Sequence, residues 1–222
     1  MPDVPEHYVP RSPNRLSVRV LIAANYVFTR IYHHLKVSGE CTLPRRGPAI
    51  LVCNHISGLD PLLVQSAVRN RLVTWMMAKE YYDLKALRWM YRAVGAIPVQ
   101  RSGRDLAATR SALRALDAGH ILGVFPEGKI ETSRDLLPFQ TGVALMAIKS
   151  NVPVVPAYLD GTQRGREMIA AVSIPTRATL RFGPAVEFDR TSTTRPALDA
   201  ATEKIRDAVN HLKSLTEHGY NA

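Results

Sequence analysis

Cysteine is scarce in this chain, with Cys41 and Cys53 as its two copies. Two cysteines do not form the disulfide framework of a small secreted domain, and their spacing is not that of a metal site, so a reducing compartment is expected. The seven histidines also lack ligand spacing, apart from the adjacent His33 and His34, which would point to different faces of a helix. The sequence therefore predicts no metal ion and disfavours a metal hydrolase.

A secretory leader and a membrane-spanning run are not expected either. Residues 1–14 hold four prolines among scattered charges, which predicts an extended lead-in and not a signal peptide. The mostly apolar stretch 15–37 is interrupted by Arg19 and Arg30, which bracket ten residues. Ten residues of helix span about 15 Å, whereas the hydrocarbon core of a bilayer is about 30 Å thick.

Acidic residues are too few to balance the basic ones, at 19 against 29, giving a formal net charge of +10. This excess predicts a partner with a negative surface, such as phosphate groups, acidic lipid headgroups or nucleic acid. No nucleic-acid-binding module is recognisable and the basic residues do not form one compact run, so nucleic acid is the least expected partner. Residues 69–114 hold ten of the basic residues: Arg69, Arg71, Lys79, Lys85, Arg88, Arg92, Arg101, Arg104, Arg110 and Arg114.

The stretch 15–37 has the pattern of an amphipathic helix. On a helical wheel its polar residues fall in one narrow stripe: Arg15, Arg19, Tyr26, Arg30 and His33. A wide apolar face beside a basic, aromatic stripe is typical of a helix that lies in a membrane interface. The alternative is a helix that packs this face on its own domain. We therefore expect an N-terminal lead-in and membrane-associating helix over 1–37 and a single domain over 38–222.

The rest of the chain alternates between predicted strands and helices. Hydrophobic residues make up 46% and charged residues 22% of the sequence, as in a globular domain with a buried core. Strands are predicted at 49–53, 73–78, 95–99, 121–125, 152–159 and 178–182. Helices are predicted at 62–68, 83–93, 105–118, 139–150 and 196–215. This alternation predicts an α/β fold, a mixed and mostly parallel sheet flanked by helices. Prolines at both ends of 152–159 predict an edge or irregular strand.

His55 follows the apolar run 49–53 and precedes Asp60 by five residues. On one helix the two would point about 140° apart, so they meet only if the chain turns between them. Gly58 supplies a permissive turn, Asp60 suits an N-cap, and Pro61 suits the first helical turn. A His–Asp pair built in this way is a base with an orienting carboxylate. The plainer alternative is an N-capping aspartate near a loop histidine.

Four motifs stand where predicted strands end, which is where α/β folds bind ligands. They are Asn54-His55-x4-Asp60, Gly95-x-Ile97-x-Val99-x-Arg101, Phe125-Pro126-Glu127-Gly128 and Val152-Pro153-Val154-Val155-Pro156. In this combination and order they resemble the glycerophospholipid acyltransferase family, including its bacterial 1-acylglycerol-3-phosphate acyltransferase branch. The resemblance covers roughly residues 38–185.

The resemblance implies acyl transfer from a thioester, acyl-CoA or acyl carrier protein, to the hydroxyl of 1-acylglycerol 3-phosphate, giving phosphatidic acid. His55 is the implied base and Asp60 its orienting partner, with no cofactor and no metal. The implied residues for the acceptor's phosphate and glycerol are Arg101, Glu127, Gly128, Lys129 and Arg134. Asn54, Gly58 and Pro126 are expected to support the site, and the backbone near Gly128 or Gly58 to bind the oxyanion. The implied location is the cytoplasmic face of an anionic membrane, held in part by the basic residues of 69–114.

The chain departs from the family pattern after Glu127-Gly128. Lys129-Ile130 stands where Thr is common, and Gln140 stands where the family usually has Lys. These differences keep open an acyltransferase with another lysolipid acceptor. A non-catalytic, basic membrane-binding protein remains a further alternative.

Overall fold

The structure, a computed structural model, describes residues 16–68, 70–100, 105–133, 135–166 and 168–219. Its centre is a seven-stranded sheet in the order β1-β7-β6-β2-β5-β3-β4. The strands are β1 (Lys36–Ser38), β2 (Ala49–Cys53), β3 (Val73–Ala78), β4 (Ile97–Val99), β5 (Ile121–Val124), β6 (Val154–Asp160) and β7 (Thr179–Phe182). All neighbouring pairs are parallel except β6 and β7. The predicted mixed, mostly parallel α/β sheet is confirmed.

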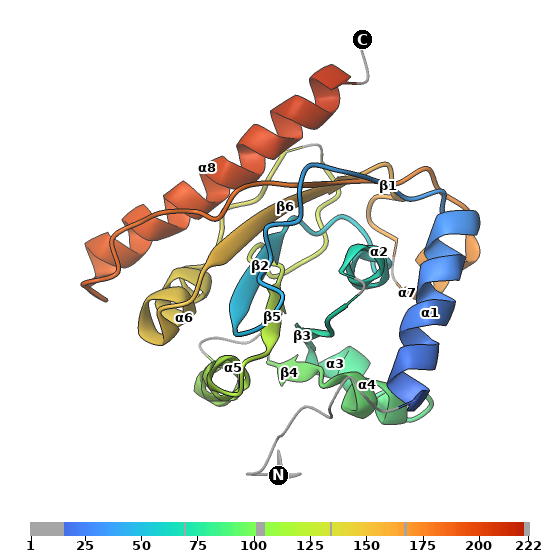
Figure 1. Ribbon diagram of the computed structural model, residues 1–222, viewed down its shortest axis with the longest axis horizontal. Helices are drawn as coiled ribbons and strands as arrows, with labels where there is room; N and C mark the ends of the chain where they lie inside the picture. Colours follow the sequence, from blue (N-terminus) through green and yellow to red (C-terminus); the bar gives the residue numbers. More distant parts are fainter. Residues whose placement is uncertain (1–15, 69, 101–104, 134, 167, 220–222) are drawn as a thin grey trace.

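Helices cover both faces of the sheet (Figure 1). They are α1 (Leu16–Ile31), α2 (Asp60–Ala67), α3 (Lys79–Tyr82), α4 (Arg88–Val94), α5 (Leu106–Asp117), α6 (Gly142–Ser150), α7 (Met168–Ser173) and α8 (Arg195–Gly219). One hydrophobic core joins the sheet to α5, α6 and α8, and a second joins its other face to α1, α2 and α7. The sheet is therefore the middle of three layers.

β2 shows why this sequence builds a doubly covered sheet. All five of its residues are buried. Ile50 and Val52 enter the core beneath α5, α6 and α8, whereas Leu51 and Cys53 enter the core beneath α2. Because side chains alternate across a strand, a continuous apolar run is needed where both faces are covered. Cys53 is a free, buried cysteine that packs as part of this strand.

The prediction that the proline-flanked strand lies at an edge is wrong, because β6 lies inside the sheet between β2 and β7. Pro156 is tolerated because it lies opposite Gly183, the residue directly after the end of β7. There, Gly183 N donates to Pro156 O at 3.0 Å, a separation typical of a ladder bond. The return bond to Gly183 O comes instead from the hydroxyl of Thr42, at 3.0 Å. A side chain thus replaces the donor that proline lacks.

The helix predicted over 83–93 is divided in the structure. α3 begins earlier, at Lys79, and α4 begins only at Arg88, with a turn between them. Backbone bonds from Leu87 N and Arg88 N to Leu84 O form this turn. The other helices lie close to their predicted positions, and Asp105 is the N-cap of α5, accepting from Ala108 N.

The N-terminal helix is attached to the domain. Asn25 Nδ2 donates to Leu62 O of α2 at 2.8 Å, and Val18 and Thr29 are buried. The predicted boundary at residue 37 falls inside β1, which pairs with β7. His33 does not belong to an exposed polar stripe, because it lies beyond the end of α1 and is buried, with Nδ1 3.1 Å from Thr176 Oγ1.

The side of α1 opposite to the buried Val18 and Thr29 is exposed and apolar. Leu16, Val20, Val27 and Ile31 lie at spacings of four and seven residues and all have large exposed side chains. The apolar circumference of this helix is therefore divided between the core and the surface. In the part of the chain that the structure describes, no helix combines the length and hydropathy needed to span a bilayer.

Candidate active site at the carboxyl edge of the sheet

The predicted site residues meet because their strands run parallel and side by side. β2 pairs with β5 through Val52 and Val124, so the loops that follow both strands leave the same edge of the sheet. The loop after β2 carries His55, and the turn after β5 carries Glu127. β6 flanks β2 on the other side, with Cys53 opposite Ala157. This is the carboxyl edge at which open α/β sheets bind ligands.

The structure brings His55 and Asp60 into contact. His55 Nδ1 lies 3.0 Å from Asp60 Oδ2, so the predicted turn between them is present. Asp60 is not the N-cap of α2, however. Leu59 occupies that position and Asp60 is the first residue of the helix. Its carboxylate turns back and accepts from Ile56 N at 2.7 Å and Ser57 N at 2.9 Å.

A single carboxylate oxygen therefore fixes both the imidazole and the loop that carries it. Asp60 is fully buried, and its Oδ1 has no hydrogen-bond partner among the described residues. Donors to the charged form offset the cost of burying it. With Nδ1–H donating to Asp60, the hydrogen-bond network assigns the free lone pair of His55 to Nε2. The imidazole side chain is 16% exposed, which leaves it open to a substrate.

Two aromatic rings that the sequence did not single out as site residues support His55. The Phe125 ring stacks on the imidazole with centroids 4.2 Å apart, and Trp75 stacks on Phe125 at 4.6 Å. Gly123 of β5 leaves room for this stack, since a Cβ there would overlap the Trp75 ring. The Phe-Pro-Glu-Gly motif thus supplies a flat apolar surface that limits rotation of the base.

Glu127 holds the backbone of the same histidine. Its Oε1 accepts from His55 N at 2.9 Å and its Oε2 accepts from Leu137 N at 3.1 Å. The carbonyl oxygen of His55 accepts from Glu131 N at 2.6 Å. Burial raises the pKa of Glu127 above its usual value, and the two backbone bonds oppose that rise. The contact of Glu127 with the acceptor stays a prediction, while its role in positioning His55 is visible.

The two glycines suggested for the oxyanion have their N–H groups engaged. Gly128 N donates to Phe125 O at 3.1 Å, and Gly58 N donates to Arg166 O at 2.9 Å. Gly128 has a positive φ of 73°, and a Cβ there would clash with the side-chain amide of Gln140. Glycine is therefore required at 128 for the close approach of Gln140.

Asn54 and Pro126 form hydrogen bonds next to His55 and Glu127. Asn54 Nδ2 donates to Leu159 O at 2.9 Å while its Oδ1 accepts from Leu159 N at 2.8 Å. This pair of bonds extends the pairing of β2 with β6 up to the residue before His55. Pro126 is buried, and its carbonyl oxygen accepts from Gln140 N at 2.9 Å.

Of the three cations predicted to bind the acceptor's phosphate, Lys129 lies among the described residues. Arg101 and Arg134 lie outside the described residues, and Lys129 is exposed directly after Gly128. Arg164, which the sequence reasoning missed, bonds Ser133 O at 2.7 Å and Asp160 Oδ1 at 2.9 Å beyond the end of β6. No motif marks Arg164, because its position follows from the turn at Gly165, whose N–H bonds Ile56 O.

Arg71, one of the ten basic residues of 69–114, does not lie beside the site. Arg71 precedes β3 and lies at the amino edge of the sheet, because β3 runs parallel to β5. Among the described residues, no group of three or more His, Cys, Asp or Glu side chains is arranged to hold a metal ion.

A strand-end histidine oriented by a buried carboxylate has the geometry that a general base needs in order to activate a hydroxyl for attack. The comparison with known families gives a more specific answer. The family described as Acyltransferase matches residues 34–160, which is more than half of the chain and includes His55, Asp60 and Glu127. The chain belongs to this family.

Curated relatives agree with the match. The 1-acyl-sn-glycerol-3-phosphate acyltransferase of Bacillus subtilis (strain 168) is 26% identical over 134 residues, covering 60% of this chain and 66% of that protein. The enzyme of the same description from Borreliella burgdorferi is 29% identical over 129 residues, covering 57% of this chain and 51% of that protein. The chain thus aligns with only part of the length of these relatives.

A solved structure shares the fold. The 1-acyl-sn-glycerophosphate acyltransferase PlsC from Thermotoga maritima is similar with a TM-score of 0.67 and 21% identity, over 90% of this chain and 80% of that one. The arrangement of sheet and helices is therefore that of a known acyltransferase structure.

The bonds to Glu127 generate a stability prediction. Glu127→Gln places an amide group against one of two backbone donors, and an unpaired buried donor costs about 1–3 kcal/mol. The pKa of Glu127 is raised in the folded state. The wild type should therefore exceed Glu127→Gln in free energy of unfolding most at pH values below the unfolded-state pKa, and this difference should decrease as pH rises through the folded-state pKa. Urea unfolding of both proteins should show a larger gap at about pH 4 than at about pH 8.

Exposed Glu187 provides the matched control, since Glu187→Gln should change stability by less than about 0.5 kcal/mol. A gap for Glu127→Gln that widens as pH rises would contradict the role given to burial.

Proposed function

We propose that this chain transfers a fatty acyl group from a thioester to the free hydroxyl of 1-acylglycerol 3-phosphate, with His55 as general base. The observation that carries the proposal is the contact between His55 Nδ1 and the buried Asp60 Oδ2, which leaves Nε2 available. Membership of the acyltransferase family and the names of the curated relatives support the reaction class and the acceptor. The donor is acyl-CoA or acyl carrier protein, and no cofactor takes part.

The reaction requires one proton to pass from the acceptor hydroxyl to His55 and then to the leaving thiolate. The acceptor hydroxyl attacks the thioester carbonyl carbon while its proton passes to His55 Nε2. The imidazolium that forms is stabilised by the Asp60 carboxylate. The tetrahedral intermediate then collapses with cleavage of the carbon–sulfur bond, and the leaving thiolate takes the proton from the imidazolium. His55 returns to its starting state, and no acyl-enzyme is formed because the thioester is already activated.

The acceptor's phosphate requires positive charge at this edge. Arg101, Lys129 and Arg134 are the proposed phosphate ligands, since guanidinium and ammonium groups form strong charge-assisted bonds with phosphate. Lys129 follows Gly128 at the exposed end of the turn next to His55. Glu127 and Gly128 are proposed to shape the glycerol site through the backbone that they position.

A different lysolipid acceptor is the second candidate. Gln140 replaces the usual lysine, and its side-chain amide lies against the backbone of Gly128. The loss of a positive charge at that point favours an acceptor with less negative charge than a phosphate monoester. An acyl-transfer assay run with several lysolipids distinguishes the two acceptors.

Attachment to a membrane follows from the divided surface of α1. Its exposed stripe of Leu16, Val20, Val27 and Ile31 is flanked by the exposed Arg19. Apolar side chains with adjacent cations suit the headgroup region of an anionic bilayer. We propose a peripheral enzyme on the cytoplasmic side, where the thioester donor is supplied. A non-catalytic membrane-binding protein would share this surface but would show no turnover.

Removal of the base tests the function directly. His55→Ala should reduce kcat/KM by about 100-fold to 10,000-fold, because no other group takes the proton. The measurement is mass-spectrometric acyl transfer with several lysolipids crossed against acyl-CoA and acyl carrier protein donors. His211→Ala on the exposed surface of α8 is the control and should keep full activity. Activity of folded His55→Ala within a few-fold of the wild type would rule out the mechanism.

Asp60→Asn separates charge from geometry. Because one oxygen accepts all three bonds, the amide oxygen of Asn can occupy the same position and keep the loop in place. The negative charge that stabilises the imidazolium is lost, so kcat should fall by about 100-fold or more while KM changes little. Circular dichroism should confirm an intact fold. Retention of normal kcat would show that the charge of Asp60 is not needed.

The exposed face of α1 predicts binding to lipid. Val20→Glu combined with Val27→Glu should weaken sedimentation with phosphatidylcholine–phosphatidylglycerol vesicles by about tenfold or more, because charged groups replace two exposed valines that the bilayer would otherwise bury. Leu215→Glu replaces an exposed apolar residue of α8 and is the control. Equal vesicle binding by the double variant and the control would show that α1 does not contact the membrane.

A further inference from the structure

A second concave site lies at the amino edge of the sheet, opposite the edge that carries His55. It is a pocket of about 290 Å³ lined by Arg45, Arg46, Gly47, Asn70, Arg71, Leu72 and His120. These residues come from the segments that lead into β2, β3 and β5. The five residues of β2 separate the two edges by about 17 Å, at about 3.3 Å per residue. The pocket is therefore distinct from the proposed acyl-transfer site.

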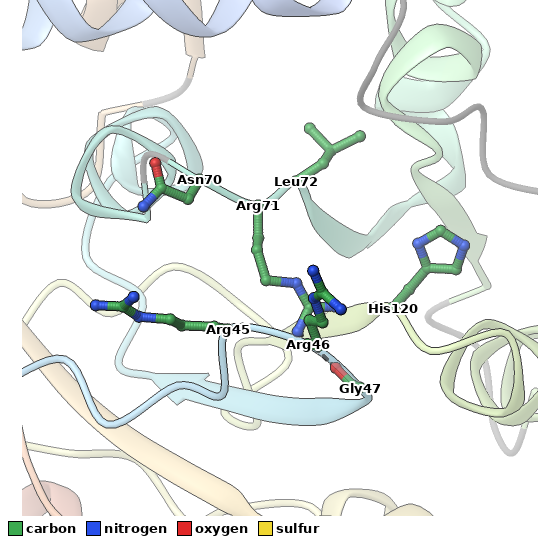
Figure 2. A pocket seen from close by; sticks show the side chains of 7 residues that line it. All are labelled: Arg45, Arg46, Gly47, Asn70, Arg71, Leu72 and His120. Carbon is green, nitrogen blue, oxygen red and sulfur yellow. Dashed lines mark hydrogen bonds between the residues drawn. The ribbon is translucent and has the colours of Figure 1, made fainter.

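Arg71 is built into this pocket. Its Nη1 donates to Pro44 O at 3.0 Å and to Gly47 O at 2.5 Å, and its Nη2 donates to Gly119 O at 2.6 Å. These carbonyl groups hold the guanidinium at the junction of three strands. In Figure 2, Arg71 and Arg46 reach the same part of the pocket beside Gly47, whereas Arg45 extends away from them.

The charge in the pocket is not balanced by the residues that line it. Carbonyl oxygens satisfy hydrogen bonds but carry no formal charge, and no lining residue is acidic. Arg45 and Arg46 form no hydrogen bond or ion pair with another described residue. Partial burial lowers the pKa of Arg71, and burial and the charge of Arg71 together lower the pKa of His120. The pKa of His120 therefore responds, in addition to burial, to the positive charge of Arg71.

The dimensions and lining of the pocket limit the ligand. Water occupies about 30 Å³ per molecule in the liquid, so the pocket has room for a phosphate group but lies at the lower limit for whole cofactors, about 300 Å³. Leu72 contributes the apolar side chain, so the lining does not suit a fatty acyl chain. Guanidinium forks match the oxygen geometry of phosphate, and neutral His120 and Asn70 can each donate one further bond.

We propose that this pocket binds a phosphate group, with Arg46, Arg71 and His120 as its principal ligands. The phosphate comes either from a small soluble phosphate compound or from the headgroup of an anionic lipid. In both cases it supplies the negative charge that the residues lining the pocket lack.

Arg46→Gln is the variant that tests this site, because Arg46 is exposed and its removal breaks no bond to a described residue. The first arm titrates the full chain with inorganic phosphate and follows the His120 imidazole by NMR. We expect a saturable shift of the His120 resonance, with the dissociation constant at least about tenfold higher in Arg46→Gln. The second arm measures binding to phosphatidylcholine vesicles with and without phosphatidic acid.

Arg110→Gln, on the exposed face of α5, is the matched control and should behave like the wild type in both arms. Loss of phosphate binding alone identifies a soluble ligand, and added loss of phosphatidic acid binding identifies a lipid headgroup. If Arg46→Gln and the wild type respond alike in both arms, the site is disproved. His55→Ala should not alter the His120 response, so failure of the acyl-transfer proposal would leave this one standing.

Discussion

The candidate active site depends on one buried oxygen atom. Asp60 Oδ2 accepts from the imidazole of His55 and from the backbone N–H groups of Ile56 and Ser57. A carboxylate inside an apolar core is unfavourable unless donors surround it. Here the donors that make its burial tolerable belong to the loop that carries the base. Stability of the loop and orientation of the imidazole therefore have the same cause, and neither can be lost without the other.

The surrounding structure secures the same histidine from three further directions. Glu127 and Glu131 bond its backbone N–H and carbonyl groups, and Phe125 stacks on its ring. Glu127 and Phe125 both belong to the turn after β5, so the Phe-Pro-Glu-Gly motif acts on the base as well as on any substrate. Asn54 extends the β2–β6 ladder to the residue before His55. An imidazole held in this way would need little reorganisation to act as the proposed base.

The sequence was sufficient for the fold class and for the meeting of His55 with Asp60, because both follow from local patterns. Apolar runs identify buried parallel strands, and parallel strands carry their following loops to one edge. The position of β6 was missed because the hydroxyl of Thr42, distant in sequence, supplies the bond that Pro156 cannot. The prediction of Asp60 as the N-cap was wrong for a related reason, since Leu59 occupies that position and the carboxylate accepts from the loop before the helix. The positions of Arg164 and Trp75 near the site could not be predicted, because they depend on tertiary contacts.

Charged side chains of opposite sign lie beyond the two ends of β2. Buried carboxylates of Asp60 and Glu127 lie beyond its carboxyl end, whereas Arg46 and Arg71 lie before its amino end. At the carboxyl edge each buried charge is met by backbone donors. At the amino edge the described lining residues provide carbonyl dipoles but no counter-charge for the partly buried Arg71. An anion bound there would stabilise the segment 45–47 that leads into β2, and so the strand that leads to His55. A phosphate group in the pocket would thus support the fold from the edge opposite to His55.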